Sequence, residues 1–498
     1  MTPSTFIKIN PADSVVVCLK AFSQGETIVV DGKPITIAQD TPMGHKVVID
    51  DTPVGTDIIK YGYPIGHALK DLKAGEWVNE NNLKTNLSGT LTYEYRPVDE
   101  QLSIANEHRT FNGYVRKNGE VGIRNEIWIV PTVGCVNGIA ERLASQLQTE
   151  TGGKGVDAIH AWHHNYGCSQ LSDDHENTRK ILRDIVLHPN AGGVLVLGLG
   201  CENNQPEAFM DLLGDYDRER IRLLVTQKVD GDEVEAGMAI LRDLYAIASQ
   251  DRREACELSR LRVGLKCGGS DGFSGITADP LVGEFSDYLV AQGGTTILTE
   301  VPEMFGAETI LMNRCKTQEL FEQTVSLINN FKEYFLSHGE PVGENPSPGN
   351  KAGGISTLED KALGCTQKCG RAPVSGVLEY GDRIQTNGLN LLSAPGNDLV
   401  AATALASSGC QIVLFTTGRG TPFGTFIPTM KVSTNSVLSS RKPNWIDFNA
   451  GKLVEGTSME ALLKEFIDKI ISVANGELTR NEANGYREIS IFKNGVTL

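Results

Sequence analysis

Aromatic residues are scarce in this chain, at 6% of its 498 residues, and no apolar run approaches membrane-spanning length. A transmembrane helix needs roughly 18 such residues, so we expect no membrane span. The start of the chain lacks a basic segment followed by an apolar one, which predicts a cytoplasmic protein without a secretory signal. Basic residues are fewer than acidic ones: 46 Lys and Arg against 62 Asp and Glu give a formal net charge of −16. That balance argues against nucleic acid or anionic membranes as partners.

What is present is typical of a folded, multidomain protein. Apolar residues make up 40% and charged residues 22% of the sequence, which is the range of ordinary globular proteins. The length predicts two to four domains. Ten cysteines are spread along the chain, and we expect free thiols or metal ligands rather than disulfides.

The pattern of apolar runs predicts an α/β fold in several parts. Residues 1–92 contain short β-type runs separated by Gly, Pro and Asp, with a hairpin signal at Asp31-Gly32. Residues 93–112 are polar and aperiodic, as in a linker. From residue 113 onward, apolar strands alternate with helices, which indicates parallel, Rossmann-like sheets in two units, 113–258 and 259–498. Residues 339–372 are irregular and rich in Gly and Pro, which is typical of a functional or disordered loop.

Unusual residues follow the predicted strands. They are Gly134-Cys135, Gly167-Cys168, Gly200-Cys201, Cys267-Gly268 and Gly418-Arg419-Gly420. Ligands of open α/β sheets bind beyond the carboxyl ends of the strands. One Gly-Cys pair would mean little, because glycines often end strands and cysteine is a common buried residue. Its repetition in three successive units favours a functional site.

Thiolates and imidazoles suit iron or zinc, but no zinc-finger spacing is present. We expect a single divalent ion, and a cluster held by Cys135, Cys168, Cys201 or Cys267 is the alternative. The run Gly268–Gly272 matches an esterase pattern. Because His338 is the only histidine after it, a turn that binds an anionic or hydroxylated ligand is the better interpretation. No complete nucleotide-binding glycine motif follows a strand.

Long segments of the chain resemble the altronate/galactarate dehydratase family of sugar-acid dehydratases. They include GHKVVIDDTPVGTDIIKYGYPIGHAL, NGEVGIRNEIWIVPTVGCVNGIA, HNYGCSQLSDDHENT, VLVLGLGCENNQ, LKCGGSDGFSGITADPLVG and NPSPGNKAGGISTLEDKALGCTQK. The resemblance implies an N-terminal SAF-type β domain followed by a larger α/β portion that forms a homodimer. It also implies dehydration of D-altronate to 2-dehydro-3-deoxy-D-gluconate in hexuronate catabolism, with Fe²⁺, or Mn²⁺, as the activating ion.

Two alternatives remain. The family includes sulfolactate sulfo-lyase, so elimination from galactarate or sulfolactate is possible on the same fold. The other alternative is a non-catalytic carbohydrate-binding protein, for which we would expect more aromatic residues.

The expected chemistry assigns roles to particular residues. A dehydratase removes the proton at C2 of the acid and protonates the hydroxyl that leaves from C3, while a metal ion stabilises the negative charge. We expect His45 and His164 to meet at a shared cleft and to supply proton transfer or metal ligation there, with Lys60 as a further catalytic candidate. Lys46, together with Lys60, would hold the substrate carboxylate. The expected metal ligands are Cys168, Cys201 and Glu202. The remaining substrate-binding candidates are Asn203, Asn204, Ser270, Asp271, Gln367, Lys368 and Arg419.

Overall fold

The computed structural model describes residues 4–98, 102 and 107–498. Three parts of the chain follow one another: a β module (residues 4–86), a middle part (residues 110–257) and a C-terminal part (residues 258–498). Residues 99–101 and 103–106 of the predicted linker at 93–112 lie outside the described residues. Its described portion docks on the C-terminal part, because Tyr93 Oη donates to Glu308 at 2.7 Å. Within the described residues, no helix has the length and apolar character needed to cross a bilayer.

The β module is built from short antiparallel strands. One sheet runs β1 (Phe6–Ile7), β2 (Val15–Cys18), β5 (Lys46–Val48) and β8 (Trp77–Val78), and a second runs β6 (Asp57–Lys60), β7 (Tyr63–Ala68) and β9 (Leu83–Lys84). Strands β3 (Thr27–Val30) and β4 (Lys33–Thr36) form the predicted hairpin. Asp31 and Gly32 connect them with φ of 50° and 82°, the left-handed pair that a tight hairpin turn requires.

The middle part contains a parallel sheet in the order β13-β12-β14-β15. Its strands are β12 (Glu126–Pro131), β13 (Ile159–Ala161), β14 (Ala191–Gly198) and β15 (Ile221–Val225), and its helices are α1 (Asn137–Thr151), α2 (Ser172–Val186), α3 (Pro206–Leu212) and α4 (Glu233–Ala248). Because successive side chains point to opposite faces, Ile127 and Ile129 pack with α1 and α4. Trp128 and Val130 pack on the other face, with α2. A small sheet in the order β11-β10-β16 adjoins it, formed by β10 (Thr110–Val115), β11 (Val121–Gly122) and β16 (Glu254–Glu257).

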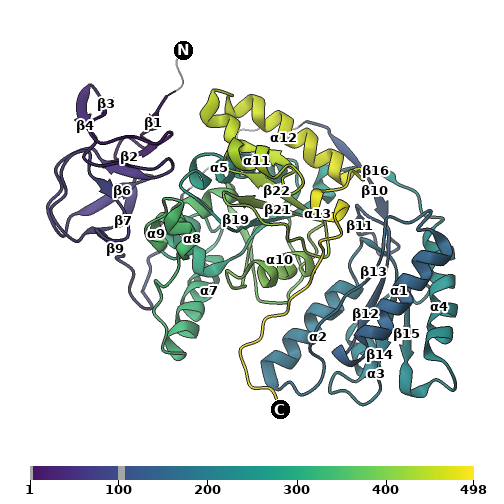
Figure 1. Cartoon of the computed structure of the whole chain (residues 1–498). Helices are drawn as coiled ribbons and strands as arrows, with labels where there is room; N and C mark the ends of the chain where they lie inside the picture. The colour runs from purple at the N-terminus through teal and green to yellow at the C-terminus, as the bar shows by residue number, and fades with distance from the viewer. Residues whose placement is uncertain (1–3, 99–101, 103–106) are drawn as a thin grey trace.

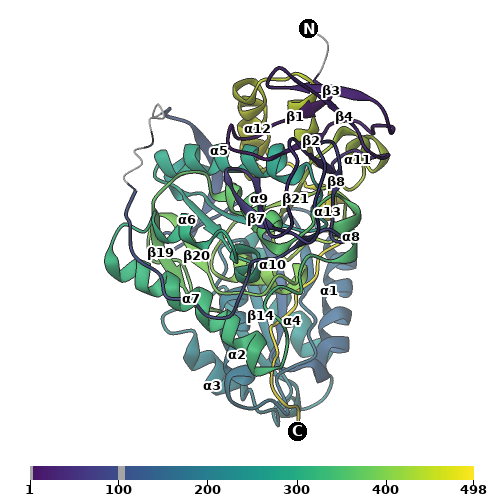
Figure 2. The same cartoon turned by 90° about the vertical axis from the view of Figure 1, so that its left-hand side faces the viewer.

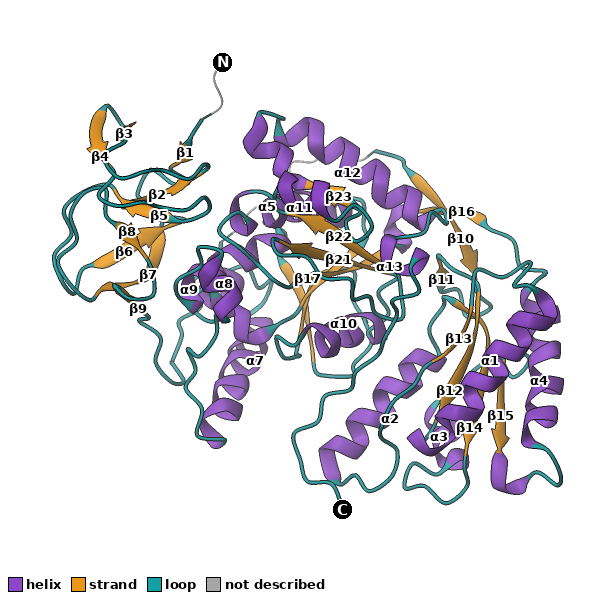
Figure 3. Ribbon diagram, in the orientation of Figure 1, coloured by secondary structure: helices purple, strands orange, loops and turns teal. Residues whose placement is uncertain are grey.

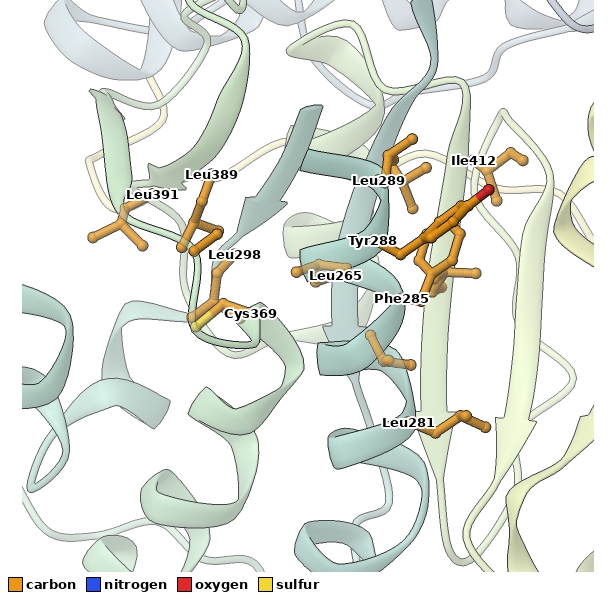
Figure 4. Packing of buried hydrophobic residues seen from close by; sticks show 14 of the residues in the cluster. Leu265, Leu281, Phe285, Tyr288, Leu289, Leu298, Cys369, Leu389, Leu391 and Ile412 are labelled. Carbon is orange, nitrogen blue, oxygen red and sulfur yellow. The ribbon is translucent and has the colours of Figure 1, made fainter. Parts of the chain in front are cut away.

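The C-terminal part contains a larger parallel sheet in the order β19-β20-β18-β17-β21-β22-β23. Its strands are β17 (Arg262–Cys267), β18 (Thr295–Leu298), β19 (Val374–Leu378), β20 (Gly388–Leu392), β21 (Ile412–Thr417), β22 (Thr429–Ser433) and β23 (Phe448–Asn449). Helix α5 (Ala278–Ala291) lays Leu281, Phe285 and Leu289 against this sheet, as Figure 4 shows. The expected α/β fold class is therefore confirmed. The β module and the middle part lie on opposite sides of the C-terminal part (Figures 1 and 3).

Further helices surround the sheet. They are α6 (Glu308–Met312), α7 (Gln318–Ser337), α8 (Pro348–Ala352), α9 (Leu358–Cys365), α10 (Asp398–Ser407), α11 (Ser436–Arg441), α12 (Met459–Ala474) and α13 (Arg480–Ala483). Two of them, α8 and α9, lie in the segment 339–372 that we expected to be irregular. Every residue of α9 is buried, so its sequence lacks the amphipathic period by which a surface helix is recognised. Both views place α8 and α9 beside the β module (Figures 1 and 2).

Candidate functional site

A buried cluster of thiols and charged groups lies where strand β17 ends. Strands β18 and β21 both follow β17 in the chain but lie on opposite sides of it in the sheet. The strand order therefore changes direction at β17, and such a topological switch point is where ligands bind in open α/β sheets. Cys267 is the last residue of β17. Glu303 lies in the turn η5 (Val301–Met304), which follows β18. Lys361 and Cys365 are one helical turn apart on α9, so they project from the same face.

Three of these side chains form a ligand set for a metal ion. Glu303 Oε2 lies 3.0 Å from Cys267 Sγ and 3.4 Å from Cys365 Sγ, and the two sulfur atoms are 3.3 Å apart. Among the residues that the structure describes, this is the one group of at least three such ligands within 4.8 Å of one another. Two thiols and a carboxylate suit a borderline-soft ion such as Fe²⁺ or Zn²⁺ better than Mg²⁺ or Ca²⁺. Three protein ligands also leave coordination positions open for a substrate.

Lysines balance the negative charge around these ligands. Lys361 Nζ lies 2.7 Å from Glu303 Oε1. Burial raises the pKa of Glu303, but Lys361, Lys266 and Lys368 outweigh burial and hold that pKa at about 2. Glu303 is therefore ionised at neutral pH. The hydrogen bond with Cys365, followed by burial, raises the pKa of Cys267 well above its usual value, so metal binding must displace a proton from this thiol.

A second carboxylate, Glu300, ties the cluster to the strand. Its backbone is left-handed, with φ of 67°, and its carboxylate accepts a hydrogen bond from Cys267 N at 3.0 Å. It also pairs with Lys266 and lies 3.6 Å from Lys368. Burial would lower the pKa of Lys266, but Glu300 and Asp398 raise it instead. The site thus holds three buried ammonium groups beside its ligands.

Lys46 and Lys60, which we expected to bind the substrate carboxylate, instead hold a carboxylate of the protein. Each Nζ lies 2.8 Å from an oxygen of Asp360 on α9. Lys46 also donates to Gly354 O at 3.0 Å and to Ser356 Oγ at 2.7 Å. These three bonds use all the protons of its ammonium group. The roles assigned to Lys46 and Lys60 are corrected accordingly: both lysines fix helix α9 to the β module.

His45 lies at the junction between the β module and α8. Its Nδ1 accepts from Trp77 Nε1 at 3.1 Å, so its Nε2 carries the proton and donates to Ala352 O at 3.3 Å. Burial lowers the pKa of His45. Gly44 packs so tightly on the C-terminal part that a Cβ at Gly272 would lie 1.9 Å from its carbonyl oxygen.

His164 lies in the middle part, in the loop that follows β13. Its Nε2 bonds Pro131 O at 2.8 Å, its Nδ1 accepts from Tyr166 N, and burial lowers its pKa to about 4. Strand β13, which precedes His164, lies on the opposite side of the C-terminal part from the β module, which carries His45 (Figure 1). Within the described part of this chain, no contact joins the two histidines, and the shared cleft stays a prediction.

The predicted metal ligands Cys168, Cys201 and Glu202 do not form a group of ligand atoms within 4.8 Å. Cys168 and Cys201 are exposed. The Glu202 carboxylate accepts hydrogen bonds from Thr132 Oγ1, in the loop after β12, and from the backbone N–H groups of Leu199 and Gly200 in its own loop. Nearby, Asn203 accepts from Ser169 N, and Asn204 donates to Thr132 O. None of these residues contacts the buried cluster at β17.

The candidates from the C-terminal part lie closer to that cluster. Ser270 Oγ is buried and has no hydrogen-bond partner among the described residues. Asp271 accepts from Thr434 and Asn435, so it joins loops and has little capacity left for a ligand. Three other candidates take different positions: Gln367 donates to Gly275 O, Lys368 is buried beside Glu300, and Arg419 is exposed.

Sequence reasoning missed Glu303, Lys361 and Lys266 and did not join Cys267 to Cys365. A lysine inside the apolar run LRVGLKC was a usable signal, because a fully buried lysine needs a charged partner.

Family models match most of the chain. Residues 4–86 match "Altronate/galactarate dehydratase SAF domain", residues 113–249 match "D-galactarate dehydratase/Altronate hydrolase, second domain", and residues 258–497 match "D-galactarate/Altronate dehydratase, C-terminal".

Full-length relatives are similar as well. An altronate dehydratase of Bacillus subtilis is 56% identical, and one of Escherichia coli is 54% identical, each across 99% of this chain and 100% of the relative. A galactarate dehydratase (L-threo-forming) of Escherichia coli is 34% identical across 96% of this chain and 94% of its own length.

Proposed function

Since this chain belongs to the D-galactarate/altronate dehydratase family, we propose that it dehydrates D-altronate to 2-dehydro-3-deoxy-D-gluconate. The observation that carries the choice of substrate is the difference in identity. The altronate dehydratases are 56% and 54% identical to this chain, whereas the galactarate dehydratase is 34% identical. The buried ligand set at β17 supports a metal-dependent elimination.

We propose Fe²⁺ as the ion, with Mn²⁺ as a substitute, held by Cys267, Glu303 and Cys365. When bound there, the ion supplies Lewis-acid stabilisation of negative charge on the substrate. Lys361 and Lys368 add fixed positive charge within the same buried region. Such preorganised charges are worth more in a water-excluded site than in water. The unpartnered Ser270 hydroxyl is available for a hydrogen bond to the polyol chain.

His45 is the proposed proton-transfer residue. Burial lowers its pKa, so the imidazole is neutral at physiological pH. Its Nδ1 is the unprotonated nitrogen in the observed hydrogen-bond arrangement. Nδ1 has one lone pair, which the Trp77 N–H group occupies, so that hydrogen bond must open first. Nδ1 would then take the C2 proton and deliver it to the hydroxyl that departs from C3, which forms water. The remaining enol tautomerises to the 2-keto acid.

We further propose that the enzyme is a cytoplasmic homodimer. Ten cysteines without a disulfide among them are typical of a reducing compartment. The dimer is an expectation from the family resemblance, and sedimentation of the purified protein tests it.

The proposal is tested by offering D-altronate, galactarate and sulfolactate to anaerobically purified protein supplied with Fe²⁺. We expect 2-keto acid, detected with semicarbazide, from altronate at the highest kcat/KM. His45→Gln should lower kcat by roughly 10²–10⁴-fold, the usual contribution of a general acid or base. His67→Gln, also in the β module, is the matched control. A preference for galactarate overturns the substrate, and full activity of His45→Gln overturns the role of that histidine.

A further inference from the structure

Three cysteines occupy one edge of the middle sheet and have no role in the site described above. Cys135, Cys168 and Cys201 follow the neighbouring parallel strands β12, β13 and β14. The carboxyl ends of parallel strands meet at one edge of a sheet. All ten cysteines lie within the described residues. These three are exposed, and the other seven are buried.

The loops that carry the three thiols are locked against one another. Each cysteine follows a glycine, and a Cβ at Gly134 would lie 2.7 Å from His164 O, while one at Gly167 would lie 2.1 Å from Thr132 O. Only glycine permits such an approach of two backbones. Gly134 N donates to Tyr166 O, and Asn204 N donates to Gly167 O, both at 2.9 Å. The loops after β12, β13 and β14 therefore form one rigid rim.

Each of these loops also holds a buried polar atom without a hydrogen-bond partner among the described residues. They are Asn137 Oδ1, two residues after Cys135, Gln170 Nε2, two residues after Cys168, and Asn204 Oδ1, three residues after Cys201. Gln170 and Asn204 are 4% and 1% exposed. The other amide atom of each is bonded, to His164 O, Thr178 Oγ1 and Thr132 O respectively. The side chains are thus held in place while one polar atom of each stays unpaired, which points to a ligand that the rim is built to meet.

The three thiols do not form a compact site for one ion. The three sulfur atoms do not lie within 4.8 Å of one another as a group, so a single ion does not fit them. An iron–sulfur cubane holds its cysteine ligands further apart, because bridging sulfides separate the irons, and thiolates are its usual ligands.

We propose that Cys135, Cys168 and Cys201 hold an iron–sulfur cluster of the [4Fe–4S] class at the carboxyl edge of β12, β13 and β14. Three protein thiolates leave one iron for a ligand from outside the chain. This site is separate from Cys267, Glu303 and Cys365, so the inference stands apart from the proposed function.

Anaerobic reconstitution of the full-length protein with iron and sulfide tests the inference. We expect about four iron and four sulfide per chain, a broad visible absorption, and an electron paramagnetic resonance signal after one-electron reduction. The variants Cys135→Ala, Cys168→Ala and Cys201→Ala should each lose at least half of the bound sulfide. Because these side chains are exposed, their thermal unfolding should match that of the unchanged protein.

Cys256→Ala and Cys267→Ala are the matched controls, and both should keep the visible spectrum. The inference is overturned if the reconstituted protein binds no sulfide, or if each of the three variants keeps its full iron and sulfide content. It is also overturned if Cys267→Ala abolishes the spectrum. Dehydratase activity is measured in parallel, and a protein with a full cluster but no activity on altronate contradicts only the proposed function.

Discussion

At the scale of single residues, Asp360 forms buried ion pairs with two lysines at once. Its two oxygens each accept from a buried lysine of the β module, Lys46 and Lys60. Burial alone would raise the pKa of Asp360, but the two lysines hold it far below its usual value. One carboxylate therefore compensates two ammonium groups that are almost inaccessible to water. Removing one member of a buried charge network leaves the others uncompensated.

We therefore expect Asp360→Asn to destabilise the protein by about 3–5 kcal/mol, as is typical when a buried ion pair loses one partner. Urea unfolding followed by circular dichroism measures the change. Asp468→Asn is the control, because Asp468 pairs with Arg109 at the surface and such pairs contribute about 1 kcal/mol or less. If both variants unfold at the same urea concentration, the buried ion pairs of Asp360 do not stabilise the protein more than a surface ion pair does.

At the scale of elements, the loop before β5 meets two glycine-rich loops of the C-terminal part. A Cβ at Gly272 would lie 1.9 Å from Gly44 O, and one at Gly354 would lie 2.3 Å from the same oxygen. Gly272 N in turn donates to Gly353 O at 2.7 Å. His45 follows directly in this loop, so the close packing of backbones sets the position of the proposed proton-transfer residue.

Gly272→Ala should displace this loop and lower kcat by about a hundredfold, the usual cost of misplacing a catalytic group by about 1 Å. Steady-state kinetics and far-ultraviolet circular dichroism together measure the effect, with secondary structure expected to stay unchanged. Gly349→Ala is the control, since its Cβ would meet nothing closer than Ser347 Oγ at 3.8 Å. Equal turnover of the two variants would show that the loop tolerates the displacement.

At the scale of the whole molecule, the middle and C-terminal parts share one hydrophobic core. Residues of β12, β14 and α2 pack with residues of α10 and β21 in a single cluster. His188 crosses this boundary, because its Nε2 bonds Cys410 O at 2.9 Å while Phe426 packs on its ring. Burial lowers the pKa of His188 to about 4, so the folded protein holds this histidine neutral.

This burial predicts a pH dependence of stability. Between about pH 6.5 and pH 4 the unfolded chain binds a proton at His188 and the folded chain does not. The contribution of His188 is therefore complete above pH 6.5 and falls by about 1.4 kcal/mol per pH unit below it. His188→Gln destabilises the protein at pH 7.5 through lost packing, but its deficit should shrink as the pH falls towards 4.

Unfolding of both proteins across this pH range tests the sign. Phe426→Leu is the matched control, because it removes packing from the same ring contact without removing a titrating group. Its deficit should stay constant with pH. A His188→Gln deficit that is equally constant would contradict a neutral, buried imidazole.

The sequence alone predicts those parts of the fold that depend on neighbouring residues, such as turns and buried strands. Asp31-Gly32 predicts its hairpin because few residue pairs adopt two successive positive φ values. The apolar runs that end at Pro131, Gly198 and Cys267 predict parallel strands, because strands covered on both faces need continuous apolar residues. The glycines and cysteines that follow these runs also mark the sheet edges correctly.

Tertiary structure alone decided which of these edges holds a compact ligand group. Cys267, Glu303 and Cys365 come from a strand, a turn and a helix that are far apart in sequence, and no local spacing connects them. Helix α9 escaped prediction because burial on every side removes its amphipathic period. From the sequence, Lys46 and Lys60 are plausible substrate-binding residues. In the folded chain both bind Asp360, which lies some 300 residues away in sequence. Charge pairing depends on distance in space, and only the folded chain sets that distance.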